Sequence, residues 1–154
     1  MKKLAFISTI LICSYTGVHQ KMILPVSLDQ KILTEIVIPD YDSTMVNALI
    51  MVESSGNNNA YCKSEDAVGC LQIRRTMVRD INRILKRQGS TVKYRYKDRW
   101  ARSKSIEMFN IYCAYYNLTS PEYQARCWNG GPKGYKKGAT KRYWSKVKSI
   151  LNPT

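Results

Sequence analysis

Histidine is almost absent from this sequence: His19, close to the amino terminus, is the single histidine in 154 residues. Ser-His-Asp triads, Cys-His nucleophile pairs and histidine-rich metal sites all place histidine beside the reacting group. One histidine near the chain end effectively excludes these sites from the body of the protein. The chemistry that remains must use carboxylates, hydroxyl groups or the backbone.

Acidic residues are also scarce, with 11 against 25 lysines and arginines and a formal net charge of +14. Such an excess attracts polyanions such as nucleic acid, an anionic membrane surface or a bacterial cell wall. Basic residues are concentrated in the segment 74–104, where aromatic residues are interleaved with them. Because no zinc-finger spacing or RNA-binding signature accompanies them, we expect attachment to an anionic cell envelope and no specific nucleic acid. A solvated basic face without a partner is the alternative.

A long apolar run is lacking at the amino terminus, because the stretch Leu4 to Cys13 is too short to cross a bilayer comfortably as a helix. Two lysines precede it and small polar residues follow it, as in a secretory signal peptide. We therefore predict a signal peptide over residues 1–16, a leader over 17–42, a folded domain over 43–154, and export to the periplasm or the exterior. Lipid anchoring at Cys13 is disfavoured, since Ile12 is bulkier than the residue usual before a lipidated cysteine.

Four cysteines follow the signal peptide, an even number that is compatible with two disulfides in an oxidising compartment. Of the three possible pairings we expect the local one, Cys62 with Cys70 and Cys113 with Cys127. Free buried thiols are the alternative. No pair has the spacing of a zinc site, so we expect no metal, and nothing in the sequence calls for a cofactor.

Helical periodicity is the main signal from residue 43 onward. The first segment, 43–56, has apolar residues at helical spacing and is apolar almost all round, which is typical of a buried central helix. Further helices are predicted near 77–89, 106–116, 120–129 and 143–151, with a short strand or extended loop between 89 and 100. The sequence predicts one small, mainly helical domain, which we expect to be monomeric.

Glu53 is an unusual residue for its position. Helical geometry places it beside the apolar stripe at the carboxyl end of the first helix. Burial and the helix dipole should both raise its pKa there, and a carboxylic acid that is still protonated near neutral pH can act as the general acid of glycosidic-bond cleavage. The alternative is an ordinary surface glutamate in the last turn of a helix.

Two further short elements follow Glu53-Ser54 in the chain: Gly69-Cys70-Leu71-Gln72-Ile73 and Ala125-Arg126-Cys127-Trp128-Asn129-Gly130-Gly131. With these elements the segment 43–131 resembles the soluble lytic transglycosylase family, which has a lysozyme-like fold. Family members show Glu-Ser at a helix end, then Gly-Leu-Met-Gln-Ile, then Ala-Tyr-Asn-x-Gly. The resemblance implies an α+β lysozyme-like domain with a substrate cleft that cleaves peptidoglycan.

The resemblance implies a role for each matching residue. Glu53 would be the catalytic acid, and the other positions would contact the saccharide: Ser54, Gly69, Leu71, Gln72, Ile73, Trp128 and Asn129. Tyr61 is a further cleft candidate because it lies between two of the motifs. Trp128 stands where the family has tyrosine, so a phenolic hydroxyl that could touch the acid is missing, while an aromatic face for stacking is retained.

The reaction implied by the family uses one carboxyl group twice and forms a 1,6-anhydro sugar without water. Ordinary glycosidases need a second carboxylate at a fixed distance from the first, and none after Glu53 has an evident catalytic setting in the sequence. We therefore prefer the lytic reaction. A hydrolytic goose-type muramidase and a non-catalytic basic protein that binds cell wall or nucleic acid are the alternatives.

Overall fold

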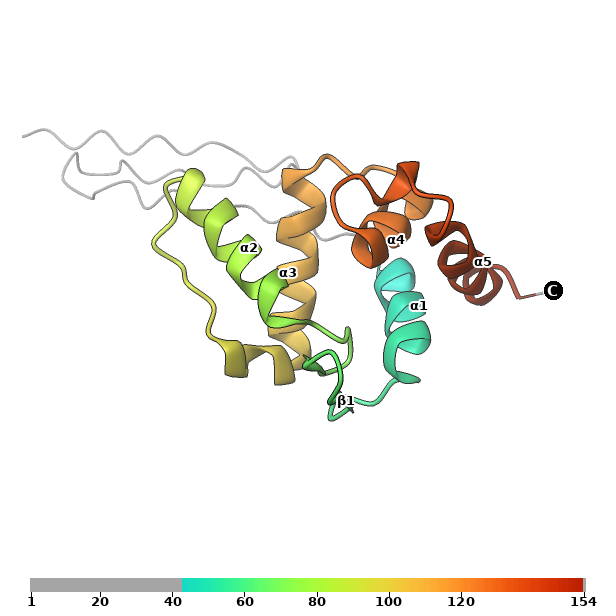
Figure 1. The fold of residues 1–154 in the computed structure, drawn as a ribbon, viewed down its shortest axis with the longest axis horizontal. Coiled ribbons are helices and arrows are strands. Elements are labelled where there is room, and N and C mark those ends of the chain that lie inside the picture. The colour runs from blue at the N-terminus through green and yellow to red at the C-terminus, as the bar shows by residue number, and fades with distance from the viewer. Residues whose placement is uncertain (1–42, 154) are drawn as a thin grey trace, which may run out of the picture. The chain divides into compact units, whose positions relative to one another are not determined.

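The computed structural model of the protein describes residues 43–153, and the predicted signal peptide, the leader, Cys13 and His19 lie outside them. Figure 1 shows the arrangement of the elements in the described part. In chain order they are α1 (Ser43–Ser54), β1 (Tyr61–Cys62), β2 (Ala67–Val68), α2 (Arg75–Arg87), η1 (Tyr96–Trp100), α3 (Arg102–Tyr115), α4 (Pro121–Gly130), η2 (Gly134–Lys136) and α5 (Thr140–Leu151). The predicted, mainly helical domain is confirmed. Within residues 43–153 no helix has the length and apolar character needed to cross a bilayer.

The helix α1 has the buried position that its sequence predicts. Met45, Val46, Ala48, Leu49 and Ile50 are all buried in the core. The helix packs against α5, which in turn packs against α4, so these helices form one group of neighbours (Figure 1). The helix ends where Ser55 and Gly56 adopt positive φ angles of 53° and 84°, a backbone conformation that stops helical hydrogen bonding.

A second group of neighbours consists of α2, α3 and η1. Aromatic side chains join the two groups in the core, where Trp128 of α4 packs edge-on against Phe109 and Tyr112 of α3, at ring-centroid distances of 5.3 and 5.9 Å. Such pairs stabilise a core beyond the area that they bury. The two groups therefore share one hydrophobic core.

The segment between the first two helices contains a hairpin that the sequence did not predict. β1 pairs antiparallel with β2, with Tyr61 opposite Val68 and Cys62 opposite Ala67. The segment 89–100, predicted as a strand or extended loop, ends instead in the 3-10 helix η1. Asp98 stabilises its start by accepting a hydrogen bond of 2.6 Å from the backbone N–H of Arg95.

Two arginines are buried inside the domain instead of lying on its surface. Arg99, only 4% exposed, donates to the backbone oxygens of Tyr96, Asp66 and Ile73 at 2.8, 2.7 and 3.0 Å. Arg126 joins α4 to the start of α5 by donating to Thr140 Oγ1 at 3.0 Å. Buried guanidinium groups with satisfied donors fix loops whose backbone would otherwise lack partners.

The four cysteines of the domain are free thiols in the structure, so the predicted local disulfides are not formed in it. Cys62 Sγ lies 3.3 Å from Ser64 Oγ at the hairpin turn, whereas the Cys70 thiol is buried and interacts with Ser105 of α3. The two thiols of this pair thus have different partners. Cys113 and Cys127 are both buried, and burial raises the pKa of the Cys113 thiol.

Candidate active site

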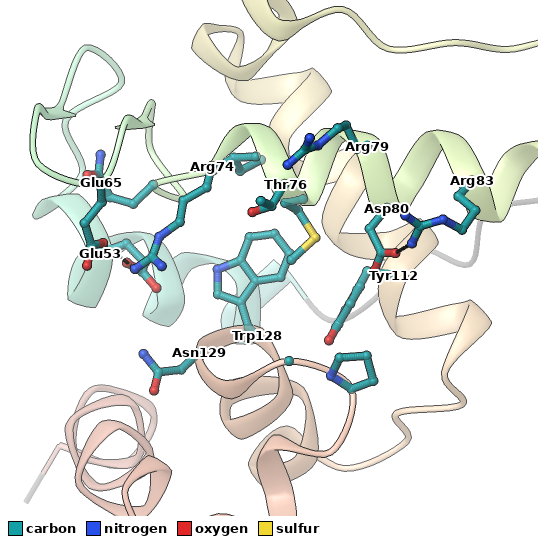
Figure 2. Close-up of a pocket in the computed structure, with 15 residues that line it drawn as sticks. Glu53, Glu65, Arg74, Thr76, Arg79, Asp80, Arg83, Tyr112, Trp128 and Asn129 are labelled. Atoms are coloured by element: carbon teal, nitrogen blue, oxygen red, sulfur yellow. Dashed lines mark hydrogen bonds and ion pairs between the residues drawn. The ribbon is translucent and has the colours of Figure 1, made fainter.

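A cavity of about 800 Å³ lies between the two groups of helices, and Glu53 is on its wall (Figure 2). Residues from α1, the hairpin segment, α2, α3 and α4 contribute to it. Its lining consists of Glu53, Glu65, Gln72, Ile73, Arg74, Thr76, Met77, Arg79, Asp80, Arg83, Tyr112, Trp128, Asn129, Gly131 and Pro132. A cavity of this size and mixed polarity can hold a small ligand or part of a polymer.

The Glu53 carboxyl group is held by a residue from the far end of the domain. Tyr143 of α5 donates a hydrogen bond of 2.6 Å from its hydroxyl group to Glu53 Oε1. This contact is possible because α1 and α5 pack side by side. Within the described residues Glu53 Oε2 has no hydrogen-bond partner, so this oxygen remains available to a ligand.

Burial raises the pKa of the Glu53 carboxyl group above its usual value. The hydrogen bond from Tyr143 and the positive charge of Arg74 act in the opposite direction, and the negative charge of Glu65 adds to the rise. The direction predicted from the helix position is therefore confirmed. Burial and the adjacent Glu53 carboxylate also hold the pKa of Tyr143 well above its usual value, so this hydroxyl group stays protonated and continues to donate.

Tyr143 brings a phenolic hydroxyl group to Glu53, whereas Trp128, which has none, stands where the family that the sequence resembles has tyrosine. The sequence shows only an aromatic residue at helical spacing in the closing segment, a pattern that predicts packing. Nothing local connects it with an acid that is 90 positions earlier in the chain. This partner of Glu53 is therefore visible only in the folded structure.

Ser54 is next to Glu53 in the chain, but its hydrogen bonds give it a structural role. Its hydroxyl group donates to the backbone oxygen of Cys70 at 2.9 Å and to that of Ile50 at 3.1 Å. Ser54 is not among the residues that line the cavity. It ties the end of α1 to the segment that carries Gln72.

The second motif divides between the cavity and the core. Gln72 and Ile73 line the cavity, whereas Leu71 is fully buried. The Gln72 side chain donates to the backbone oxygens of Ala60 and Gly69 at 3.2 and 2.9 Å, so its NH₂ group holds the hairpin, and its side-chain oxygen has no hydrogen bond to the described residues. The predicted contact of Leu71 with a saccharide is wrong for this structure, since its side chain has no exposed surface.

Gly69 does allow a close backbone approach, but to another part of the chain rather than to a ligand. Its φ angle is +78°, and a Cβ atom there would lie 2.1 Å from the backbone oxygen of Arg99. Gly69 does not line the cavity. Its role is to bring the hairpin segment against η1.

Trp128 and Asn129 of the third motif both line the cavity. Trp128 is only 8% exposed, because most of its indole ring is used in the packing with Phe109 and Tyr112. The expected open aromatic face for stacking is therefore mostly covered. Asn129 is exposed, and its amide group is free to contact a ligand.

Tyr61, the further cleft candidate, lies outside the cavity. Its ring is 55% exposed and packs against Trp100 of η1 at a centroid distance of 6.1 Å. Tyr61 pairs with Val68 in the hairpin and is not among the residues that line the cavity. The position of Tyr61 in the chain, between two motifs, was a poor guide to its position in space.

The structure also adds charged residues to the cavity that the motifs did not indicate. Three of these are arginines on or next to α2, namely Arg74, Arg79 and Arg83, and two are acids, Glu65 and Asp80. Arg74 pairs with Glu65, and Arg83 Nη1 lies 2.5 Å from Asp80 Oδ1. The helical spacing of the α2 residues was visible in the sequence, but not which face of the helix meets the cavity.

No family model and no curated protein matches this chain. Among residues 43–153, histidine, cysteine, aspartate and glutamate form no group of three that could hold a metal ion. Among the acids that line the cavity, Glu53 has no ion pair within the described residues, whereas Glu65 and Asp80 are paired with arginines.

Proposed function

We propose that the protein is a peptidoglycan lytic transglycosylase of lysozyme-like fold, with Glu53 as its catalytic acid and base. The observation that carries the proposal is the environment of the Glu53 carboxyl group. Glu53 has a raised pKa, is oriented by Tyr143, and has a carboxyl oxygen without a partner among residues 43–153 on the wall of a cavity of about 800 Å³. The order of the three sequence motifs supports the choice of substrate.

In the proposed reaction, protonated Glu53 donates its proton to the glycosidic oxygen between N-acetylmuramic acid and N-acetylglucosamine. The carboxylate that results accepts the proton of the muramyl 6-hydroxyl group as this oxygen attacks the anomeric carbon. The products are a 1,6-anhydromuramyl end and a free N-acetylglucosamine end, and Glu53 recovers its proton. A raised pKa favours the first step because a larger fraction of the acid is then protonated at a given pH.

Tyr143 contributes to both steps by fixing the carboxyl group. Its hydrogen bond occupies Oε1 and so leaves Oε2 as the oxygen that exchanges the proton with the sugar. The same bond stabilises the carboxylate that forms after the first step. Gln72 and Asn129, which line the cavity on different elements, are suited to hold the acetamido and hydroxyl groups of the sugars.

A hydrolytic muramidase is the second candidate, and one observation favours it. Glu65 lines the same cavity, and its charge acts on the Glu53 carboxyl group. A second carboxylate in the cleft could orient a water molecule for attack. Glu65 is, however, ion-paired with Arg74 and half exposed, so its carboxylate is already engaged by a guanidinium group.

The decisive experiment is mass spectrometry of the muropeptides that the protein, without residues 1–16, releases from purified peptidoglycan. We expect anhydro-muropeptides from the native sequence and a loss of at least about 1,000-fold in rate for Glu53→Gln, which cannot donate the proton. Reducing-end products would establish the hydrolytic reaction. Equal release by the variant, or no release by either protein, would overturn the proposal and favour a basic wall-binding protein.

A further inference from the structure

The cavity extends beyond Glu53 along α2, where further charged residues line it. Figure 2 shows the arginines spaced along this side of the cavity, from Arg74 near Glu53 to Arg83 beside Asp80. Arg79 is five residues beyond Arg74, which corresponds to about 7.5 Å along a helix axis. A bound polymer would therefore contact the far part of the cavity with a different portion from the one that contains the bond beside Glu53.

The charged residues that line the cavity are not all paired. Three arginines and three acids contribute to the lining. Arg74 is paired with Glu65 and Arg83 with Asp80. Arg79 has no hydrogen bond and no ion pair within the described residues, so its guanidinium group is the positive charge that remains for a ligand.

The lining of this part of the cavity combines apolar or weakly polar residues with the ion pair between Asp80 and Arg83. Met77 and Thr76 precede it on α2, and Tyr112 and Pro132 contribute to the lining from other elements. A ligand group that fits here carries a carboxylate together with short apolar segments. Neutral sugar rings alone would leave the Arg79 charge without a partner.

We propose that Arg79 binds a free carboxylate of the stem peptide of peptidoglycan, and that the cleft thereby selects strands whose stems are ionised. This inference rests on the proposed function. In a strand with stems the lactyl carboxyl group of muramic acid is consumed in the amide bond to the peptide, so the free carboxylates belong to the stem. Arg79 is one turn of α2 from Arg83, and the planar guanidinium group matches a carboxylate with two donors.

The test compares two preparations of the same soluble, uncrosslinked glycan strands, one untreated and one with its carboxylates amidated by carbodiimide and ammonium chloride. Binding is measured by calorimetry at 0.15 M salt with Glu53→Gln protein, which does not consume the ligand. We expect the untreated strands to bind about fivefold more tightly than the amidated ones, the size of an exposed ion pair. Adding Arg79→Gln should bring this ratio close to one.

Lys86→Gln is the matched control, because it removes the same charge from the same helix but lies outside the cavity lining. It should leave the ratio unchanged. A ratio that Arg79→Gln leaves intact, equal binding of both preparations, or no binding at all would overturn the inference.

The same strands separate this inference from the proposed function. Cleavage of both preparations by the native sequence, with no preference lost in Arg79→Gln, would retain the enzyme and reject the carboxylate site. A carboxylate preference that depends on Arg79, without cleavage of either preparation, would reject the enzyme and retain the site.

Discussion

The two walls of the cavity are held in different ways. On the wall to which α1 and α4 contribute, the helical wall, the packing of α5 against α1 brings Tyr143 to Glu53, and within the described residues Glu53 has no ion pair. On the opposite wall, to which the hairpin segment and α2 contribute, the hairpin wall, the buried Arg99 of η1 and the backbone contact of Gly69 fix the loop, and the acids are paired with arginines. Glu53, on the helical wall, has a raised pKa. In the proposed reaction the helical wall therefore supplies the proton.

The largest effect is expected from breaking the hairpin wall at Gly69. In Gly69→Ala the new Cβ atom would meet the backbone oxygen of Arg99 at 2.1 Å, and the φ angle of +78° adds backbone strain. We expect a loss of about 3 kcal/mol in the free energy of unfolding, measured by urea denaturation.

Gly89→Ala is the matched control for this substitution. Gly89 has a similar φ angle of +75°, but nothing lies within 4 Å of its Cβ position. The free energy of unfolding of Gly89→Ala should fall by only about 1 kcal/mol, which is the cost of the backbone conformation. Equal losses at the two sites would show that the contact with Arg99 does not hold the wall.

The next largest effect is expected from Tyr143→Phe, which acts on the helical wall. Loss of the hydrogen bond leaves the Glu53 carboxyl group without its orienting partner, and we expect kcat/KM to fall by about 10- to 100-fold. Because this bond lowers the pKa of Glu53, its loss should raise that pKa further. The pH at which activity declines on the alkaline side should therefore move upward.

A pH–rate profile measures both effects of Tyr143→Phe at once. Tyr135→Phe is the control, since Tyr135 is also a half-buried aromatic residue of this region but packs against Tyr123. It should change neither the rate nor the profile. A lower rate with an unmoved alkaline limb would assign to Tyr143 a packing role only.

A smaller effect is expected on stability when Glu53 is replaced by glutamine. The folded pKa of Glu53 is raised above its unfolded value, so the protonated acid favours folding and this contribution is lost as the pH rises through the folded pKa. Glu53→Gln should therefore raise Tm by a few degrees at pH 7 and by less at pH 4. Glu65→Gln, on the hairpin wall, should show no such gain because Glu65 is ion-paired and half exposed.

The helical wall was easier to predict from the sequence than the hairpin wall, for physical reasons. The apolar pattern of residues 43–54 determines both the helix and the side that it buries, so the position of Glu53 and the direction of its pKa shift followed from periodicity. The hairpin wall depends on contacts between distant residues, such as Arg99 with Ile73, for which no local pattern exists. For the same reason Leu71 and Tyr61 were placed in the cleft, although one is in the core and the other is on the outer surface.

The smallest effect is expected from Glu65→Gln on the rate of the reaction, and it separates the two candidate mechanisms. In the lytic mechanism Glu65 transfers no proton. Its removal withdraws a charge that raises the pKa of Glu53 and leaves Arg74, which lowers that pKa, without its partner. Both changes lower the pKa of Glu53, so the alkaline limb should move slightly downward while kcat/KM at its optimum changes by less than about threefold.

Glu107→Gln, which alters an acid of α3 outside the cavity, is the control and should leave the pH–rate profile in place. If Glu65 instead oriented a hydrolytic water, the same substitution would abolish reducing-end products, and the hairpin wall would share the chemistry that the raised pKa of Glu53 assigns to the helical wall alone.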